Sequence, residues 1–242
     1  MSNGYIYIVT NTVDDGINTI DYINEAIFSA KSLRMVDKTA NICLFTDKEI
    51  DVDKGVFDCI NIVEMSLRCK QKYLLQSPYS KTIYIDSDTY VNHNINDMFE
   101  LLDKYEFVCC NDFARKRKLN IPEYMEIPYG FSEINGGIIG YKKCENFTKF
   151  INMWDKYYDK YKSVVVWDQP SCRIALWKSD INIYILPTEY NRRSKKTKTK
   201  VIDAKRCCDS RFPRDHLKTR IFHFHGLEGM NAREMEEISQ IL

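Results

Sequence analysis

The chain has 242 residues, and its 35 Lys and Arg residues against 34 Asp and Glu residues leave a net charge of +1. With 44% hydrophobic and 29% charged residues and 6 prolines, the composition excludes a disordered chain, a collagen and a protein defined by a strongly polyionic surface. A chain of this length forms one large α/β domain or two small ones, with a core large enough to fold without cross-links.

Nine cysteines occur, an odd number that includes two adjacent pairs. We interpret them as reduced and mostly buried. The first ten residues lack a basic segment, and no stretch approaches the roughly 18 apolar residues of a membrane span. The sequence therefore predicts a cytoplasmic protein without a membrane span.

Apolar runs rich in β-branched and aromatic residues recur in the first half of the chain. They predict strands at Tyr5–Val9, Ile42–Phe45, Ile60–Val63, Ile83–Ile85 and Phe107–Cys110. Helices are predicted between several of these strands, at Asp21–Met35, Met65–Leu75 and Asn96–Leu102. Alternating strands and helices favour βαβ units and a largely parallel sheet.

The second half is less regular. Strands are predicted at Gly137–Tyr141, Ile181–Leu186 and Ile221–Phe224, and one helix at Phe147–Tyr161. That helix carries a broad aromatic face, which we interpret as core packing rather than a cofactor site.

A basic segment, Arg192 to Arg206, holds eight Lys and Arg residues and one Asp, hence a charge of +7. It fits a solvated loop or a cover over an anionic substrate. Nucleic-acid readers usually spread basic charge over a face and interleave aromatic residues, so we expect no nucleic-acid partner.

The strongest local signal is an apolar strand that runs into Asp86-Ser87-Asp88. On an extended chain the side chains of Asp86 and Asp88 point the same way. Two like charges on one face repel unless a cation lies between them, so the pair predicts a site for Mg²⁺ or Mn²⁺. The alternative is a turn that merely ends the strand.

Two of the four histidines, His223 and His225, lie in the segment Ile221 to Gly226 near the C-terminus, in or just after a predicted strand. Imidazole beside carboxylates shifts the preference from Mg²⁺ towards Mn²⁺. At most one of the two needs to be a ligand, and a structural role in an apolar strand is the alternative.

Two further segments are suited to close contact with a ligand. Asn135, Gly136 and Gly137 open a strand with paired glycines, which permit unusual dihedrals and let a substrate approach the backbone; the alternative is an ordinary turn. The pair Asp168-Gln169 follows an apolar run and precedes a proline suited to a helix start. For Asp168 the alternative is a helix N-cap.

The order of these four segments resembles that of nucleotide-sugar glycosyltransferases of the GT-A fold, particularly glycosyltransferase family 8, the glycogenin-like group. In that family an apolar strand ending in Asp-x-Asp-Thr is followed by Asn-(Ser/Gly)-Gly, then Asp-Gln, then His-x-x-Gly. The resemblance implies an α/β fold with a Rossmann-like, mostly parallel central sheet flanked by helices and a smaller antiparallel element in the second half. It implies one domain over 1–242, with a nucleotide-binding half (1–110) and an acceptor and donor-sugar half (111–242).

The resemblance also assigns roles to single residues. Tyr22 corresponds to the tyrosine that stacks on the nucleotide base, Lys70 to a basic residue near the sugar nucleotide, and Asp112 to the acid that holds donor-sugar hydroxyls. The implied catalytic residues are Asn135, Asp168 and Gln169, and the implied metal ligands are Asp86, Asp88 and His223. The implied substrate-binding residues are Thr10, Asn11, Tyr22, Lys70, Asp86, Ser87, Asp112, Gly136, Gly137 and Gly226.

One departure concerns the diphosphate. The family continues His-x-x-Gly with Lys-Pro-Trp, whereas this chain has Leu227–Met230 at the corresponding place. We hypothesise that the basic segment supplies the phosphate-neutralising charge instead.

The function that the resemblance implies is Mn²⁺- or Mg²⁺-dependent transfer of a hexose from a nucleoside-diphosphate sugar to an acceptor hydroxyl. UDP is the implied nucleotide, retention the implied stereochemistry, and a glycan, a protein or a lipid-linked sugar the acceptor. One alternative is a haloacid-dehalogenase-type phosphohydrolase, which also carries Asp-x-Asp after an apolar strand. Another is a non-catalytic module that binds nucleotide sugars, for which the missing lysine argues.

Overall fold

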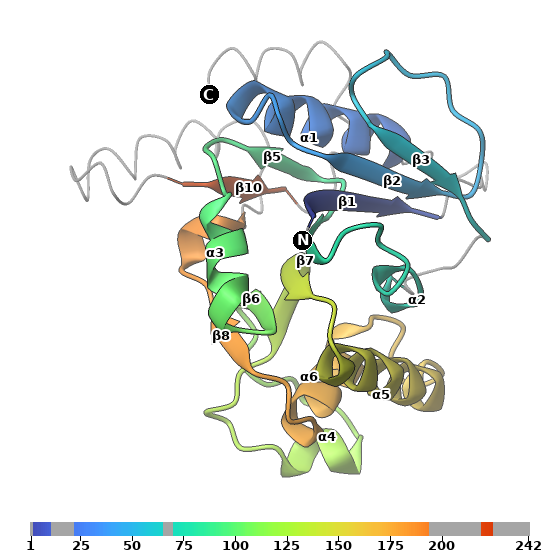
Figure 1. Ribbon diagram of the computed structural model, residues 1–242. Helices are drawn as coiled ribbons and strands as arrows, with labels where there is room; N and C mark the ends of the chain where they lie inside the picture. The colour runs from blue at the N-terminus through green and yellow to red at the C-terminus, as the bar shows by residue number, and fades with distance from the viewer. Residues whose placement is uncertain (1, 11–21, 65–69, 194–218, 225–242) are drawn as a thin grey trace. The chain divides into compact units, whose positions relative to one another are not determined.

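The computed structural model of the chain describes residues 2–10, 22–64, 70–193 and 219–224 (Figure 1). The protein has a mixed α/β fold with a mostly parallel seven-stranded sheet of order β3-β2-β1-β4-β7-β6-β8 and a three-stranded sheet of order β5-β10-β9. The chain divides into two compact units. The first comprises residues 1–6, 66–84 and 97–186, and the second residues 7–65, 85–96 and 187–242.

The first unit is built on the start of β1 (Asn3–Val9), on β4 (Lys81–Ile85), β6 (Phe107–Asn111), β7 (Ile134–Lys142) and β8 (Ile183–Ile185). β1 pairs with β4 and β6 with β8 in parallel, whereas β6 and β7 are antiparallel. The register of β6 and β7 shifts between Cys109, whose partner is Ile139, and Cys110, whose partner is Asn135. Residues 136–138 therefore form a bulge in β7.

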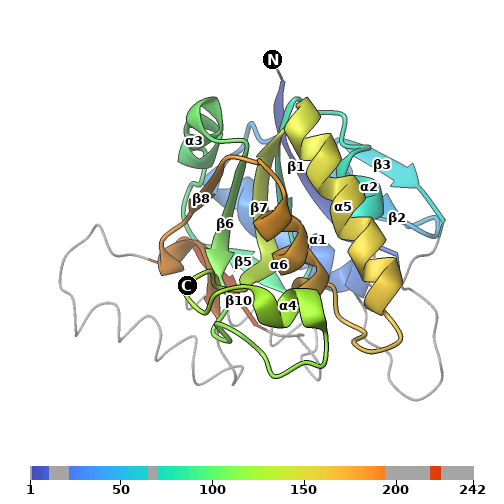
Figure 2. The same cartoon turned by 90° about the horizontal axis from the view of Figure 1, so that it is seen from below.

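The helices of the first unit are α2 (Gln71–Leu74), α3 (Asp97–Lys104), α4 (Pro122–Glu126), α5 (Glu145–Tyr161) and α6 (Gln169–Lys178). Successive residues of a strand face opposite sides of the sheet, so α3 and α5 cover opposite faces of β7 (Figure 2). A Cβ on Gly140 would lie 3.3 Å from Met98 of α3, whereas the Tyr141 ring stacks on Phe147 of α5 with centroids 4.2 Å apart.

The second unit holds the end of β1, α1 (Tyr22–Val36), β2 (Ile42–Thr46), β3 (Cys59–Ile62), β5 (Thr89–Val91), the 3₁₀ helix η1 (Thr188–Asn191), β9 (Arg192–Arg193) and β10 (Ile221–His223). β2 and β3 are parallel, and β10 pairs antiparallel with β5 and parallel with β9. The helix α1 buries the apolar residues Ile23, Ala26, Ala30 and Leu33, and it also buries Glu25, Ser29 and Ser32.

The sequence located most of these elements. Every predicted strand is present with slightly shifted ends, and α1, α3 and α5 match predicted helices. The predicted core face of α5 is confirmed, with Phe150, Ile151, Trp154 and Tyr158 buried. Of the helix expected at 65–75, residues 65–69 lie outside the described part, and α2 covers Gln71–Leu74.

Short elements escaped prediction because they hold too few residues to show a period. They are β5, α4, η1 and β9. The helix α6 does begin at Gln169, as the following proline indicated. Among the described helices, none combines the length and apolar character that crossing a lipid bilayer requires.

Candidate active site

The carboxylates of the Asp-x-Asp motif lie in a turn of the second unit. β4 ends at Ile85 and β5 begins at Thr89, so Asp86 and Asp88 occupy the connection and not an extended strand. The expectation of strand geometry was wrong here. The Thr89 hydroxyl donates to the Asp86 carbonyl at 2.9 Å and closes the turn.

Polar residues of α1 hold this turn in place. The Ser87 hydroxyl donates to Glu25 Oε2 at 3.2 Å, and the hydroxyls of Ser29 and Thr89 are 2.7 Å apart. Ser32 Oγ accepts from the backbone N–H of Val91 at 2.8 Å. The buried polar face of α1 therefore supports the segment that carries the two aspartates. Ser87, expected to bind substrate, bonds to Glu25 in this structure.

The predicted metal ligands do converge. Ligand atoms of Asp86, Asp88 and His223 all lie within 4.8 Å of one another. His223 Nε2 is 3.2 Å from Asp88 Oδ1 and 3.7 Å from Asp86 Oδ2. The neighbouring backbone N–H of Phe224 donates to the Asp88 carbonyl at 2.9 Å, which ties the end of β10 to the turn.

A second contact orients the imidazole. His223 is buried, and its Nδ1 lies 2.9 Å from Asn191 Oδ1. Because an amide oxygen can only accept, Nδ1 carries the proton, and in the neutral ring Nε2 presents a lone pair to the carboxylate side. Burial alone lowers the pKa of His223, but Asp88 and Asp86 outweigh burial and raise it.

This donor set fits a divalent cation. It offers two hard carboxylate oxygens and one imidazole nitrogen, a combination that suits Mn²⁺ better than a set of oxygens alone. The ligand atoms are close enough for modest side-chain movements to bring them to coordination distances of about 2.1 Å. The hydrogen bond to Asn191 supplies the outer contact that a ligating histidine usually has.

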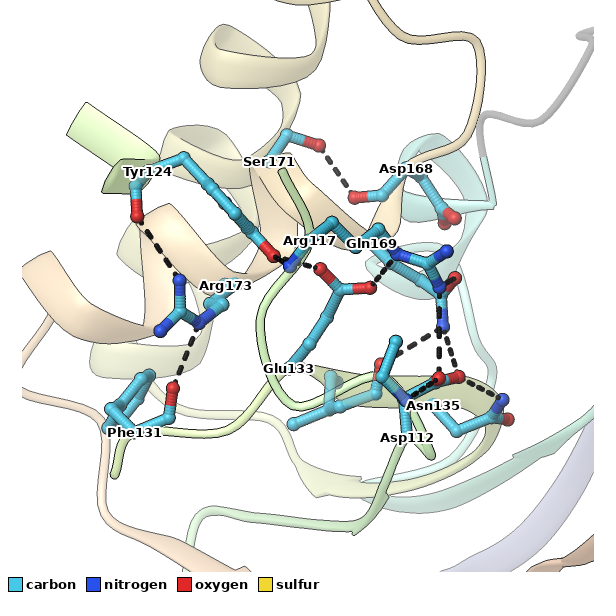
Figure 3. Close-up of polar contacts among 12 residues, drawn as sticks. Asp112, Arg117, Tyr124, Phe131, Glu133, Asn135, Asp168, Gln169, Ser171 and Arg173 are labelled. Carbon is cyan, nitrogen blue, oxygen red and sulfur yellow. Dashed lines mark hydrogen bonds and ion pairs between the residues drawn. The ribbon is translucent and has the colours of Figure 1, made fainter. Parts of the chain in front are cut away.

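A second polar group lies in the first unit and is called here the Asp112 cluster: Asp112, Arg117, Glu133, Asn135 and Gln169 (Figure 3). Asp112 follows β6 directly and is 4% exposed. Its Oδ2 accepts from the amides of Asn135 at 3.1 Å and Gln169 at 2.9 Å. Its Oδ1 accepts from the backbone N–H of Ala114 at 2.8 Å.

Arg117 and Glu133 form the inner part of this cluster. The Glu133 side chain is fully buried, and Arg117 Nε donates to its Oε1 at 2.5 Å. The Tyr124 hydroxyl donates to Glu133 Oε2 at 2.6 Å. Burial raises the pKa of Glu133, against the hydrogen bonds from Tyr124 and Arg117. The carboxylate is therefore held between two donors, out of reach of water.

Asp168 and Gln169 stand at the start of α6, as the sequence indicated. Asp168 occupies the N-cap position of α6, as the alternative predicted, but its side chain makes no capping hydrogen bond. Its carbonyl accepts from Trp154 Nε1 at 3.1 Å and from the Ser171 hydroxyl at 2.7 Å. The backbone of Asp168 thus anchors α6 to α5. The residue as a whole is buried, with 8% of its surface exposed.

Gly136, the first of the paired glycines, lies against a lysine. Neither Gly136 nor Gly137 has a positive φ, so the expectation of unusual dihedrals was wrong. Lys70 Nζ donates to the Gly136 carbonyl at 2.8 Å, and a Cβ on Gly136 would lie 3.2 Å from that nitrogen. Glycine therefore lets an ammonium group approach the bulge. Asn135 Oδ1 accepts from the Gly137 N–H at 2.9 Å, which fixes the Asn135 amide.

The other predicted residues are placed as follows. Thr10 is buried just after β1, and Tyr22 is the first residue of α1. Asn11 and Gly226 lie outside the described residues, as does the basic segment beyond Arg193.

Sequence reasoning missed Arg117, Glu25 and Asn191. Arg117 belongs to the basic run Arg115–Lys118, which was a visible signal, but no spacing rule connects it to Glu133. Nothing in the pattern around Glu25 or Asn191 indicates their contacts.

The fold is similar to that of several glycosyltransferases. The galactosyltransferase LgtC, solved with donor and acceptor sugar analogs, matches with a TM-score of 0.63 at 12% identity, over 100% of this chain and 96% of LgtC. Mouse xyloside xylosyltransferase 1 matches with a TM-score of 0.61 at 13% identity, over 95% of this chain and 100% of the mouse chain. GlyE of Streptococcus pneumoniae TIGR4 matches with a TM-score of 0.61 at 17% identity, over 99% of this chain and 60% of GlyE.

No protein-family model and no curated protein sequence matches this chain. At identities of 11–17% the structural matches establish the fold, which is the GT-A fold. The predicted fold class is confirmed.

Proposed function

We propose that the protein is a metal-dependent glycosyltransferase that uses a nucleoside-diphosphate sugar. The observation that carries the proposal is the convergence of Asp86, Asp88 and His223 on a chain with the GT-A fold. LgtC, of the same fold, was solved with donor and acceptor sugar analogs.

In this proposal a metal ion held by three side chains binds the diphosphate. Asp86, Asp88 and His223 would hold Mn²⁺, or Mg²⁺ as the second choice. A bound divalent cation neutralises negative charge that develops on a leaving diphosphate. Asn191 keeps Nε2 of His223 aimed at the carboxylates, so the chain contributes a preformed ligand and does not need to reorganise it.

Other side chains would bind the donor sugar and stabilise its transition state. Glycosyl transfer passes through a state with oxocarbenium character, and oxygen atoms held near the ring stabilise that positive charge. Asp112, Asn135, Asp168 and Gln169 are the candidates, and Lys70 is a candidate contact to the donor. Thr10, Asn11, Tyr22 and Gly226 are proposed for the nucleotide and phosphates.

The finer assignments belong to the same proposal. The motif resemblance implies UDP as the nucleotide, a hexose as the sugar and retention of anomeric configuration. It also implies membership of glycosyltransferase family 8 and division of one domain near residue 110. A glycan, a protein or a lipid-linked sugar is the proposed acceptor. The basic segment is the proposed substitute for the missing Lys-Pro-Trp lysine.

The test is a panel of nucleoside-diphosphate sugars with Mn²⁺, Mg²⁺ or EDTA, read by thermal unfolding and by release of nucleoside diphosphate. We expect one UDP-sugar with Mn²⁺ to raise the unfolding temperature and to be hydrolysed slowly. Asp88→Asn should lose both effects. Asp159→Asn, an exposed aspartate that pairs with Lys162, is the control and should keep both.

Other outcomes separate the alternatives. Stabilisation by UDP and Mn²⁺ without release of UDP, in the presence of acceptor candidates, would support the non-catalytic binding module. No response of the wild type to any nucleotide sugar would overturn the proposal.

A further inference from the structure

Arg117 connects three members of the Asp112 cluster, although nothing in the motif resemblance assigns it a role. Its Nε donates to the buried Glu133 at 2.5 Å, and its Nη2 donates to Gln169 Oε1 at 3.3 Å. The same Nη2 lies 3.7 Å from Asp112 Oδ1. The guanidinium carbon of Arg117 lies over the Trp167 ring, 5.6 Å from its centroid.

The amide of Gln169 has little hydrogen-bonding capacity left. Its Nε2 donates to Asp112 Oδ2 at 2.9 Å and to the Ile134 carbonyl at 3.1 Å. Both partners can only accept, so both amide hydrogens are used and Nε2 must point to them. Oε1 accepts one hydrogen bond from Arg117 and retains a second lone pair. A ligand that contacts this side chain through its amide therefore meets Oε1.

Arg117 is itself held firmly. Glu133, its anchor, is fully buried, receives a second hydrogen bond from Tyr124, and is tied by its carbonyl to the backbone N–H of Asp112 at 2.8 Å. The backbone N–H of Arg117 donates to the Tyr124 hydroxyl at 2.8 Å. A planar guanidinium holds its donors in a fixed fork, so it bonds to Glu133 and Gln169 in one set geometry that the flexible ammonium of a lysine does not reproduce.

We propose that Arg117 is a positioning residue for the transfer reaction. Its guanidinium bonds to the buried Glu133 and to Gln169, and so holds the Gln169 side chain in a fixed position. This position determines where Gln169 Oε1 contacts the donor sugar. The inference rests on the proposed function, since it assigns Gln169 a contact with the sugar. It adds Arg117 to the site residues that the motifs define. It also adds the contacts that run from Glu133 through Arg117 to Gln169.

The test must separate this role from the stability of the fold, because Arg117→Met alone leaves Glu133 buried without its ion-pair partner. Glu133→Gln removes that charge and keeps an acceptor for Arg117 Nε. We therefore compare Glu133→Gln with the double variant Arg117→Met/Glu133→Gln. The readouts are the unfolding temperature and the kcat and KM for release of UDP from the UDP-sugar that the wild type hydrolyses.

We expect the two variants to unfold at similar temperatures and to differ in kcat. The double variant should lose about 10-fold to 100-fold in kcat relative to Glu133→Gln, with KM for the donor changed by less than about threefold. Arg117→Lys should keep most of the stability but not the rate.

Equal kcat values in Glu133→Gln and the double variant would overturn the inference and leave the proposed function intact. A full recovery of rate in Arg117→Lys would also overturn it, because a flexible ammonium does not reproduce the fixed geometry in which the guanidinium holds its two partners. Absence of UDP release in the wild type, with every nucleotide sugar tried, would overturn the proposed function and the inference together.

Discussion

His223 and Asn191 form a pair in which the amide oxygen fixes the imidazole: Nδ1 and Oδ1 are 2.9 Å apart. The two residues come from β10 and from the 3₁₀ helix η1, 32 positions apart in the chain. The pair determines which ring nitrogen faces Asp86 and Asp88.

Replacement of Asn191 by Ala is expected to weaken Mn²⁺ binding about 10-fold to 100-fold, because the ring loses the contact that sets its tautomer and angle. Titration of Mn²⁺ by calorimetry measures this. Asn191→Asp restores an acceptor for Nδ1–H and should bind Mn²⁺ more tightly than Asn191→Ala. Equal affinities of wild type and Asn191→Ala would show that the pair does not support a metal ligand.

The choice of metal should depend on His223. An imidazole favours Mn²⁺ over Mg²⁺, whereas an amide oxygen in the same place is a hard ligand that does not. In His223→Gln we expect the stabilisation by Mn²⁺ to fall towards that by Mg²⁺. Unfolding temperatures of wild type and variant, each with either ion at matched concentration, give the comparison. An unchanged preference for Mn²⁺ in the variant would place the nitrogen ligand elsewhere.

Gly140 is predicted to be a position where a methyl group is not tolerated. A Cβ there would lie 2.5 Å from Val108 Cγ2 and 3.3 Å from Met98 Cε, inside a closed core. Overpacking of this kind costs about 1–3 kcal/mol, so Gly140→Ala should reduce the free energy of unfolding by that amount in a urea titration. Gly130→Ala is the matched control, because nothing lies within 4 Å of its Cβ. A similar loss in both variants would contradict the packing argument.

Because of Glu123, the free energy of unfolding should change with pH in the acid range. Lys160 Nζ lies 2.5 Å from its carboxylate and Tyr161 also donates to it, and these contacts lower the pKa of Glu123 from 4.5 to about 2. A carboxyl group with a lowered pKa stabilises the fold above its unfolded pKa and loses that contribution as the pH falls towards the folded value.

Glu123→Gln should therefore lower the Tm at neutral pH and converge with the wild type near pH 2. The pair is partly exposed, so the difference at neutral pH should stay below about 2 °C. Lys160→Met should show the same convergence. Thermal unfolding between pH 2 and pH 7 measures both, and a difference that grows towards low pH would refute the assignment.

The main elements could be predicted because their signal lies in the local sequence. The strand β6 is apolar from Phe107 to Cys110, and α5 repeats large side chains on one face. The proximity of Asp86, Asp88 and His223 could be predicted from residue order, since Asp-x-Asp and His223 each stand beside a recognisable strand. The turn at Asp86–Asp88 could not, because a hydroxyl of Thr89 and the polar face of α1 decide its geometry.

Arg117 and Asn191, which hold other side chains of the site in place, could not be predicted for a similar reason. Arg117 meets Glu133 because the loop after β6 folds back so that Glu133 N–H donates to the Arg115 carbonyl. Likewise, Asn191 meets His223 because β9 pairs with β10. Such pairings depend on tertiary contacts that no spacing in one sequence encodes.

The bulge in β7 separates the local contacts of the strand from its pairing with β6, two properties that usually change together. Cys109 pairs with Ile139 and Cys110 with Asn135, so residues 136–138 lie between consecutive rungs of the ladder. Insertions, deletions or substitutions in this short stretch can alter what Lys70 and Asn135 contact without moving the rungs on either side. A related chain could therefore acquire a different ligand preference here while its sheet order stayed the same.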